Sequence, residues 1–267
     1  MNVAARSSSR DAARLGHLAT GAVYVVVGLV TLAAAITRHV PPHSPQGALR
    51  YMFPGELGTV ALIGIGIGLI VDAVWQVVRA STDADGAGRG VLGMAERSGW
   101  LFAGLVHLGL GVAAIRIAFG FHQSGSERQA RSWTAFGLAL PFGRWLVAGV
   151  AIATMVVALV LLVRAGTGDV DKRIDWGAMR SGAGTVVRVL GQLGMIARAI
   201  VYAVVGAFLL RAALEASAQQ TRGVAGALRA IRAEPYGWVI LAFIGIGFIA
   251  NGALEFVRLR YHRIDTR

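Results

Sequence analysis

Six long apolar stretches, separated by short polar connections, dominate the pattern of hydrophobic and polar positions along the chain. A helix needs roughly 20 apolar residues to cross the hydrocarbon core of a bilayer, which is about 30 Å thick. The stretches that approach or exceed this length are 15–36, 57–78, 99–119, 143–164, 194–214 and 236–257. The pattern therefore predicts six transmembrane helices, and the connections between them are too short for a separate soluble domain.

The first, third and fifth stretches are copies of one another. Each contains a glycine, a polar aromatic residue eight positions later and a second glycine four positions beyond that. The three sets are Gly16/Tyr24/Gly28, Gly99/His107/Gly111 and Gly194/Tyr202/Gly206. A second apolar stretch follows each copy, so the chain is expected to form three helical hairpins in series.

The second stretches of hairpins one and three also align with each other at a constant shift. The shift places Gly47-Ala48-Leu49 on Gly226-Ala227-Leu228, Gly58 on Gly237, Gly66 on Gly245, Gly68 on Gly247, Asp72 on Asn251 and Arg79 on Arg258. Hairpin two keeps Gly143 and Arg164 in register but has Val157 at the Asp or Asn position. Strict functional equivalence of the three hairpins is therefore not expected.

These motifs carry a resemblance to a known family. First helices with G-x7-[YH]-x3-G and second helices with GAL…G…GxG…[DN]…R resemble the bacterial membrane family named domain of unknown function 1206. The resemblance covers nearly the whole chain after residue 14. It implies six transmembrane helices in a bacterial inner membrane, and it implies no activity and no catalytic residue.

The expected architecture is an all-α, polytopic membrane protein. Its three hairpins should be inserted in the same sense and related by a pseudo-threefold axis along the membrane normal, as parallel repeats can be. The expected segments are a polar tail (1–14), repeat one (15–82), repeat two (97–166), a linker (167–190), repeat three (192–260) and a second tail (261–267). The first tail is expected to be disordered, and WGAMRSGAGTVVRVLGQ, which begins in the linker, could form a short amphipathic surface helix.

Composition agrees with a membrane location. Hydrophobic residues make up 55% of the chain and charged residues 15%, whereas an ordinary globular chain is about a quarter charged. The net charge of +12 comes from arginines beside the apolar stretches, where anionic lipid headgroups are the expected partners. Nucleic acid is not an expected partner, because aromatic and basic residues are not interleaved as in single-strand-binding proteins.

Charge also predicts the orientation. Fifteen of the 26 Lys and Arg residues lie on the side of the N-terminus and eight on the opposite side. The positive-inside rule therefore places both termini in the cytoplasm, and the family resemblance implies that the membrane is the bacterial plasma (inner) membrane. The chain has no cysteine, which excludes disulfides, thiolate catalysis and iron–sulfur clusters.

The main candidate for intramembrane chemistry is Asp72, because an ionisable residue inside the bilayer costs on the order of 3 kcal/mol and is functional by default. Side chains lean toward the N-terminus of their own helix, so Tyr24 and Asp72 on antiparallel helices should converge. Tyr202 and Asn251 should repeat this geometry. The candidate polar site is Tyr24, Asp72, His107, Tyr202 and Asn251, with Tyr24–Asp72 and Tyr202–Asn251 as predicted hydrogen-bonded pairs.

Three interpretations of this polar set remain open. The pairs could simply clip each hairpin together, as modest interhelical hydrogen bonds do. Alternatively Tyr24, His107 and Tyr202 could face a common axis and, with Asp72, line a path for a proton or small solute. The set could also be completed by another protein.

Other polar residues do not predict chemistry. His39 and His43 have a spacing that suits a metal on a helix, and His122 is on the same side, but Pro41 and Pro42 forbid that helix. No nucleophile, base and orienting group can be assembled on one side of the membrane. We therefore expect no catalytic residue, no metal site and no cofactor, and an enzyme is not expected.

Glycines inside the apolar stretches are expected to let helices approach closely, as small-xxx-small motifs do. The predicted packing glycines are Gly28, Gly64, Gly66, Gly68, Gly111, Gly206, Gly245 and Gly247. Close packing favours a non-catalytic accessory or assembly subunit, whose partner would be another membrane protein because no large loop is available. The alternative is a translocator of a small solute, ion or lipid, with a polar path along the pseudo-threefold axis.

Overall fold

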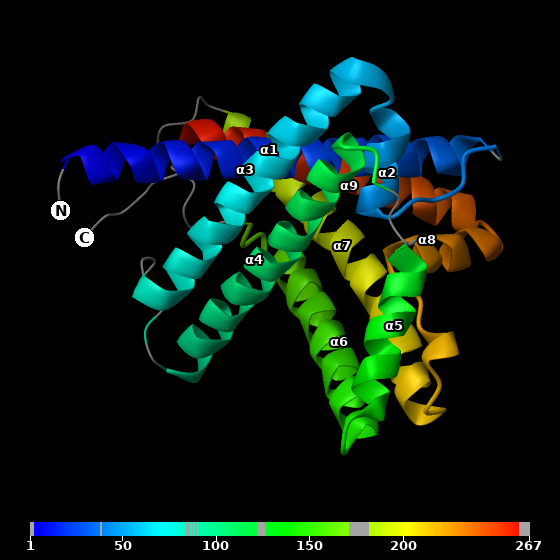
Figure 1. Ribbon diagram of the computed structural model, residues 1–267. Coiled ribbons are helices and arrows are strands. Elements are labelled where there is room, and N and C mark those ends of the chain that lie inside the picture. Colours follow the sequence, from blue (N-terminus) through cyan, green and yellow to red (C-terminus); the bar gives the residue numbers. More distant parts are fainter. Residues whose placement is uncertain are drawn as a thin grey trace.

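A computed structural model describes residues 3–37, 39–83, 86, 88, 90–121, 126–170 and 182–261, and this part of the chain is all-helical. Six long helices are joined by short ones (Figure 1). In chain order they are α1 (Val3–Ile36), α2 (Pro45–Met52), α3 (Gly55–Thr82), α4 (Val91–Ala118), α5 (Ser126–Ala139), α6 (Gly143–Thr167), α7 (Ala183–Leu214), the 3-10 turn η2 (Ala218–Gln220), α8 (Val224–Ala233) and α9 (Gly237–Tyr261).

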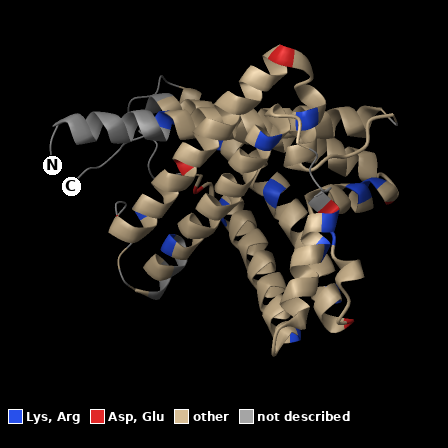
Figure 2. Cartoon of the chain, viewed as in Figure 1, with Lys and Arg blue, Asp and Glu red and all other residues tan. Residues whose placement is uncertain are grey.

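The six long helices are apolar and long enough to cross a membrane. Their candidate spans are Arg14–Ile36, Gly55–Thr82, Arg97–Ala118, Gly143–Thr167, Ala183–Leu214 and Gly237–Leu259. This confirms the six predicted transmembrane helices. Charged residues concentrate at the ends of helices and in connections, and the middle parts of the long helices carry few of them (Figure 2).

Residues at the helix ends explain where several of the helices begin or end. α2 starts after Ser44, whose hydroxyl accepts a hydrogen bond from the Gly47 amide at 3.2 Å, as N-cap residues do. α3 follows Pro54, which occupies its N-cap position, and α6 ends at Gly168 with φ +72°. Glycine is favoured at such a left-handed helix end because it has no Cβ.

Two expectations about the polar segments were wrong. α1 begins at Val3, so the tail expected to be disordered continues the first transmembrane helix. Extending an existing helix avoids the cost of nucleating a new one, and the alanines of this segment favour helix. Likewise, residues 183–192 belong to α7 and not to a separate surface helix, while residues 171–181 lie outside the described part of the chain.

The most extensive packing joins successive repeats. α3 of repeat one packs along α4 of repeat two, α6 of repeat two along α7 of repeat three, and α9 of repeat three along α1 of repeat one. The second helix of each repeat thus packs on the first helix of the next, and repeat three closes back onto repeat one. In Figure 1 the axes of these three pairs run in clearly different directions.

Packing within a hairpin occurs in repeats one and three. A Cβ added at Gly68 of α3 would lie 2.5 Å from the Cβ of Ala19 in α1, and one at Gly247 of α9 would lie 2.4 Å from the Cβ of Ala197 in α7. Small residues on both helices are therefore what allows these hairpins to close.

Repeat two differs, since α4 and α6, both described along their whole length, are not among the helix pairs with extensive contact. Its residues at the equivalent positions are Phe102, which is 69% exposed, and Ala153, which is also exposed. A phenylalanine in place of alanine prevents the close approach of the two helices that is seen in the other two hairpins.

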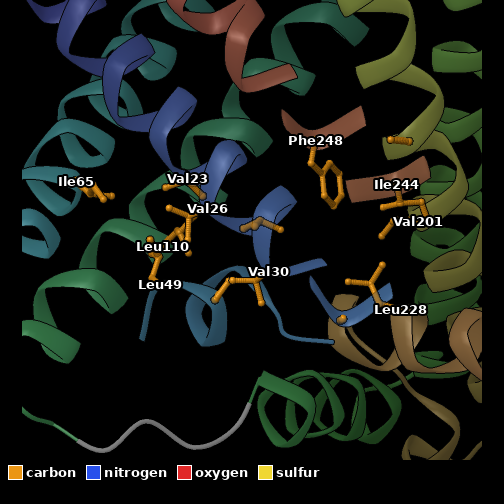
Figure 3. Packing of buried hydrophobic residues seen from close by; sticks show 14 of the residues in the cluster. Val23, Val26, Val30, Leu49, Ile65, Leu110, Val201, Leu228, Ile244 and Phe248 are labelled. Carbon is orange, nitrogen blue, oxygen red and sulfur yellow. The ribbon is translucent and has the colours of Figure 1, made fainter. Parts of the chain in front are cut away.

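The larger cluster of buried hydrophobic residues lies where repeats one, two and three meet and contains no residue of α6, whereas a smaller cluster joins Ala165 of α6 to Met195 of α7 and Leu254 of α9. Figure 3 shows side chains of α1, α3, α4, α7 and α9 gathered in the larger cluster, with Leu49 of α2 and Leu228 of α8. Burial of such side chains contributes roughly 25 cal/mol per Å² of apolar surface relative to water. Within the bilayer the same residues stabilise the fold through close contact with one another.

Candidate functional site

Two buried pairs of histidine and carboxylate lie between repeats. Nδ1 of His107 in α4 lies 2.5 Å from Oδ2 of Asp72 in α3, and the Asp72 side chain is only 5% exposed. On the same helix, Nε2 of Gln76 donates to Oδ2 of Asp72 at 3.4 Å. This pair therefore fastens repeat one to repeat two.

The second pair fastens repeat three to repeat one. Nδ1 of His17 in α1 lies 2.8 Å from Oε2 of Glu255 in α9. Nη1 of Arg258 donates to Oε1 of Glu255 at 2.5 Å, and Arg198 of α7 lies within electrostatic reach of the same carboxylate. A carboxylate held in apolar surroundings needs such partners, because an unpaired buried charge is very costly.

The predicted pair of Tyr24 with Asp72 was wrong. Asp72 does face α1, but it packs on Gly16, where an added Cβ would lie 2.5 Å from Oδ1 of Asp72. Tyr24 lies eight residues further along α1, roughly 12 Å at 1.5 Å per residue. The depth estimate from sequence was too coarse by two helical turns.

The predicted pair of Tyr202 with Asn251 was wrong for the same reason. Asn251 packs on Gly194, the counterpart of Gly16, where an added Cβ would lie 3.0 Å from its Oδ1. Its side chain is 0% exposed, and within the described residues neither Oδ1 nor Nδ2 has a hydrogen-bond partner.

The two tyrosines lie near each other instead. Tyr202 lies within electrostatic reach of Tyr24 and Arg198. The ring of Tyr24 is 6.0 Å from that of Phe248, and Cζ of Arg198 is 5.9 Å from its centroid. The structure thus brings Tyr24 and Tyr202 together, whereas His107 belongs to the separate contact with Asp72.

Four polar residues of these clusters were missed in the sequence: His17, Gln76, Arg198 and Glu255. Gln76 and Glu255 did leave a signal, because the shift that aligns Arg79 with Arg258 also aligns them with each other. His17, Arg198 and Glu255 are ionisable residues inside or at the edge of apolar stretches, which is itself a reason to examine them.

The predicted packing glycines lie at the contacts between helices, with one exception. Added Cβ atoms at Gly28 and Gly111 would lie 2.8 Å from the backbone oxygens of Gly245 and Gly66, and one at Gly206 would lie 3.3 Å from that of Ala151. Gly68 and Gly247 instead face their own hairpin partners. Gly64 has no atom within 4 Å of an added Cβ, so its expected packing role was wrong.

The remaining sequence candidates lie at the surface or in connections. His43 stacks on Tyr51 with ring centroids 5.2 Å apart, and His122 lies outside the described residues. Among the residues described, no group of three or more His, Cys, Asp or Glu side chains could hold a metal ion. Arg211 donates to Glu215 at 2.7 Å just beyond the end of α7, and this hydrogen bond lowers the pKa of the Glu215 carboxyl.

Comparison with known proteins identifies the repeats. The family model described as Domain of Unknown Function (DUF1206) matches residues 15–83, 98–168 and 193–262. The chain belongs to this family. The uncharacterized protein YxxB of Bacillus subtilis (strain 168) is 31% identical to it over 251 residues, which cover 94% of this chain and 90% of YxxB. No solved structure matches the chain.

These matches confirm the family resemblance seen in the repeat motifs. This DUF1206 member is a multi-pass membrane protein of three tandem repeats whose apolar helices are suited to a lipid bilayer. Chemically, its polar clusters can bind or exchange protons and can hold helices together. The two histidine–carboxylate pairs lie on α1, α3, α4 and α9. Both pairs are closer than the apolar core to the helix ends that share a side with the chain termini.

Proposed function

We propose that this DUF1206 protein is a non-catalytic accessory subunit of a complex in the bacterial inner membrane. It binds one transmembrane helix of a partner protein on the open face of repeat two. We define this open face by Leu146, Gly149, Val150, Ala153 and Val157 of α6, all of which are exposed.

The observation that carries the proposal is the open hairpin of repeat two. In repeats one and three, the position of Ala153 is a glycine, and a transmembrane helix of the same hairpin packs on it. In repeat two, Ala153 is exposed and Val157 is 49% exposed. The face that binds a helix in two repeats is thus available in the third.

The chemistry of this face favours a helix over other occupants. α6 is the least buried of the six spans, and Gly149 and Ala153 are spaced four residues apart. Transmembrane helices associate through such small residues because their backbones can approach closely. The open face lies within an apolar span, so a partner must itself be in the membrane.

The expected lipid environment is part of the same proposal. Arginines are more numerous on the side of the termini, which supports a cytoplasmic location of both termini and contact with anionic headgroups there. This bias orients the open face relative to the partner.

Photo-cross-linking from the open face tests the proposal. A photoreactive side chain at Val157, in tagged protein expressed at native level, should cross-link to one membrane protein. The same probe at Val74, which is 60% exposed on α3, should not. Ala153→Leu should abolish the Val157 product, because a larger side chain blocks close approach, while Ala207→Leu at an exposed alanine of α7 should leave it intact.

Three outcomes would contradict the proposal. Products at Val157 and Val74 that are alike would indicate random lipid-facing collisions. A product with twice the mass of the chain would identify a second copy as the occupant. A Val157 product that survives Ala153→Leu would show that the open face does not bind the partner.

A translocator is the second candidate. The observation that favours it is the unpaired, buried amide of Asn251 beside the ionisable residues of α1, α7 and α9. The apolar core argues against it, because valines, leucines and isoleucines occupy the place where the three repeats meet. Purification of the protein alone with one retained solute or lipid would favour translocation.

A further inference from the structure

Repeats one and three carry the same three kinds of polar group on their second helices, but the carboxyl group is at a different aligned position in each. Repeat one has Asp72, Gln76 and Arg79, whereas repeat three has Asn251, Glu255 and Arg258 at the aligned positions. Each repeat therefore has one carboxyl, one amide and one guanidinium. The carboxyl lies one helical turn closer to the arginine in repeat three.

Because of this difference in position, the carboxylate of Glu255 is in direct contact with a guanidinium, which is always positively charged. Glu255 and Arg258 are three residues apart, which places them on one helix face, and they are hydrogen-bonded at 2.5 Å. Arg198 adds a second positive charge within reach. Glu255 is therefore paired with permanent positive charge in addition to His17, whose Nδ1 lies at 2.8 Å.

Asp72 has no such permanent charge in contact. Arg79 is seven residues away, and the amide of Gln76 stands between the two groups. Oε1 of Gln76 accepts from Arg79 at 3.1 Å, and Nε2 of Gln76 donates to Asp72 at 3.4 Å. The ionisable side chain in direct contact with Asp72 is His107.

Among the side chains that the structure describes, the helices packed around Asp72 supply no other charge in contact with it. α1 presents Gly16. On α4, Arg97 donates to the backbone oxygens of Ala80 and Ser81, and Trp100 lies against Arg79 with Cζ 4.8 Å from the ring centroid. Among the described side chains, the charge of Asp72 is therefore balanced in direct contact by His107.

We propose that Asp72 and His107 form an intramembrane proton-binding site, whereas His17 and Glu255 form a fixed structural contact. A proton from water on the side of the termini binds to the pair, shared between the imidazole nitrogen and the carboxylate oxygen. Its loss returns it to water and leaves an unbalanced carboxylate in apolar surroundings, which is strongly disfavoured.

Nuclear magnetic resonance of the full chain in lipid nanodiscs tests this assignment. The ¹⁵N signals of His107 and the ¹³C signal of the Asp72 carboxyl should show one bound proton on the pair at pH 7, as imidazolium or as carboxylic acid. His17 should be a neutral imidazole at the same pH. A neutral His107 beside an ionised Asp72 would overturn the proposal.

An exchange variant supplies the matched control. Asp72→Asn combined with Gln76→Glu copies the arrangement of repeat three, so the polar groups and net charge are unchanged. His107 should then be a neutral imidazole at pH 7. A persistent imidazolium at His107 in this variant would also overturn the proposal. If the variant does not fold, Asp72→Asn alone serves, because Asn251 shows that an asparagine is accommodated at the aligned position.

Discussion

At the scale of single residues, two glycines of one motif serve different contacts. Gly66 faces α4 of the next repeat, where an added Cβ would lie 3.0 Å from the backbone oxygen of Gly111. Gly68, half a turn away, faces α1 of its own hairpin. A GxG motif thus permits close approach on two sides of α3. The helix packs against α4 of the next repeat on one side and against α1 of its own repeat on the other.

Gly28 and Gly64 provide a matched pair for testing these contacts. Gly28→Ala should destabilise the protein by about 1–3 kcal/mol, since overpacking has that cost and the added Cβ would lie 2.8 Å from two backbone atoms of α9. Gly64→Ala should be neutral or stabilise by at most about 1 kcal/mol through helix propensity. Denaturant titration in detergent measures both changes, and equal effects would refute the packing role of Gly28.

The polar residue Asp72 shows what the sequence could predict about the site and what it could not. Asp72 was identified because a carboxyl inside an apolar stretch is costly, and it is buried as that argument requires. Its partner was not identified, because periodicity gives the depth of a residue along its helix but not which helix lies beside it. His107 was singled out, yet only the packing of α3 on α4 shows that it contacts Asp72.

At the scale of elements, repeat two has diverged from the other two in a consistent way. Phe102 replaces an alanine, Ala153 replaces a glycine, and Val157 and Leu161 stand at the positions of the polar groups in α3 and α9. The changes remove the small residue of the first helix and the polar contacts of the second helix. Val157 was noticed in the sequence, but its meaning required the open hairpin to be seen.

Cross-linking between introduced cysteines tests the difference between hairpins, because the natural chain has none. A short thiol-specific cross-linker should join Ala19→Cys to Gly68→Cys in repeat one and Ala197→Cys to Gly247→Cys in repeat three. The aligned pair in repeat two, Phe102→Cys with Ala153→Cys, should remain unjoined. Efficient joining of the repeat-two pair would show that its hairpin closes, and the proposed open face would not exist.

At the scale of the whole molecule, the sequence predicted the helices and the repeats but not their order of contact. Internal repetition and apolar length depend on local sequence, so both could be read directly. One of the three interpretations was that polar pairs hold hairpins one and three together. Instead, the most extensive packing joins one repeat to the next. Gly28 and Gly111 of first helices meet Gly245 and Gly66 of second helices, and Gly206 meets Ala151 and Met155 of α6.

Six membrane crossings predict a topology that labelling can test. The end of α3 and the end of α4 must then lie on opposite sides of the membrane, and under the positive-inside rule the excess of arginine predicts that the end of α3 is cytoplasmic. Phe121→Cys, exposed just after α4, should react with a membrane-impermeant thiol reagent in intact spheroplasts. Thr82→Cys, exposed at the end of α3, should react only after permeabilisation. The reverse pattern would invert the proposed orientation, and with it the side from which protons reach Asp72. Equal reaction of both before permeabilisation would contradict the six crossings themselves, since one of the two positions must be shielded by the bilayer.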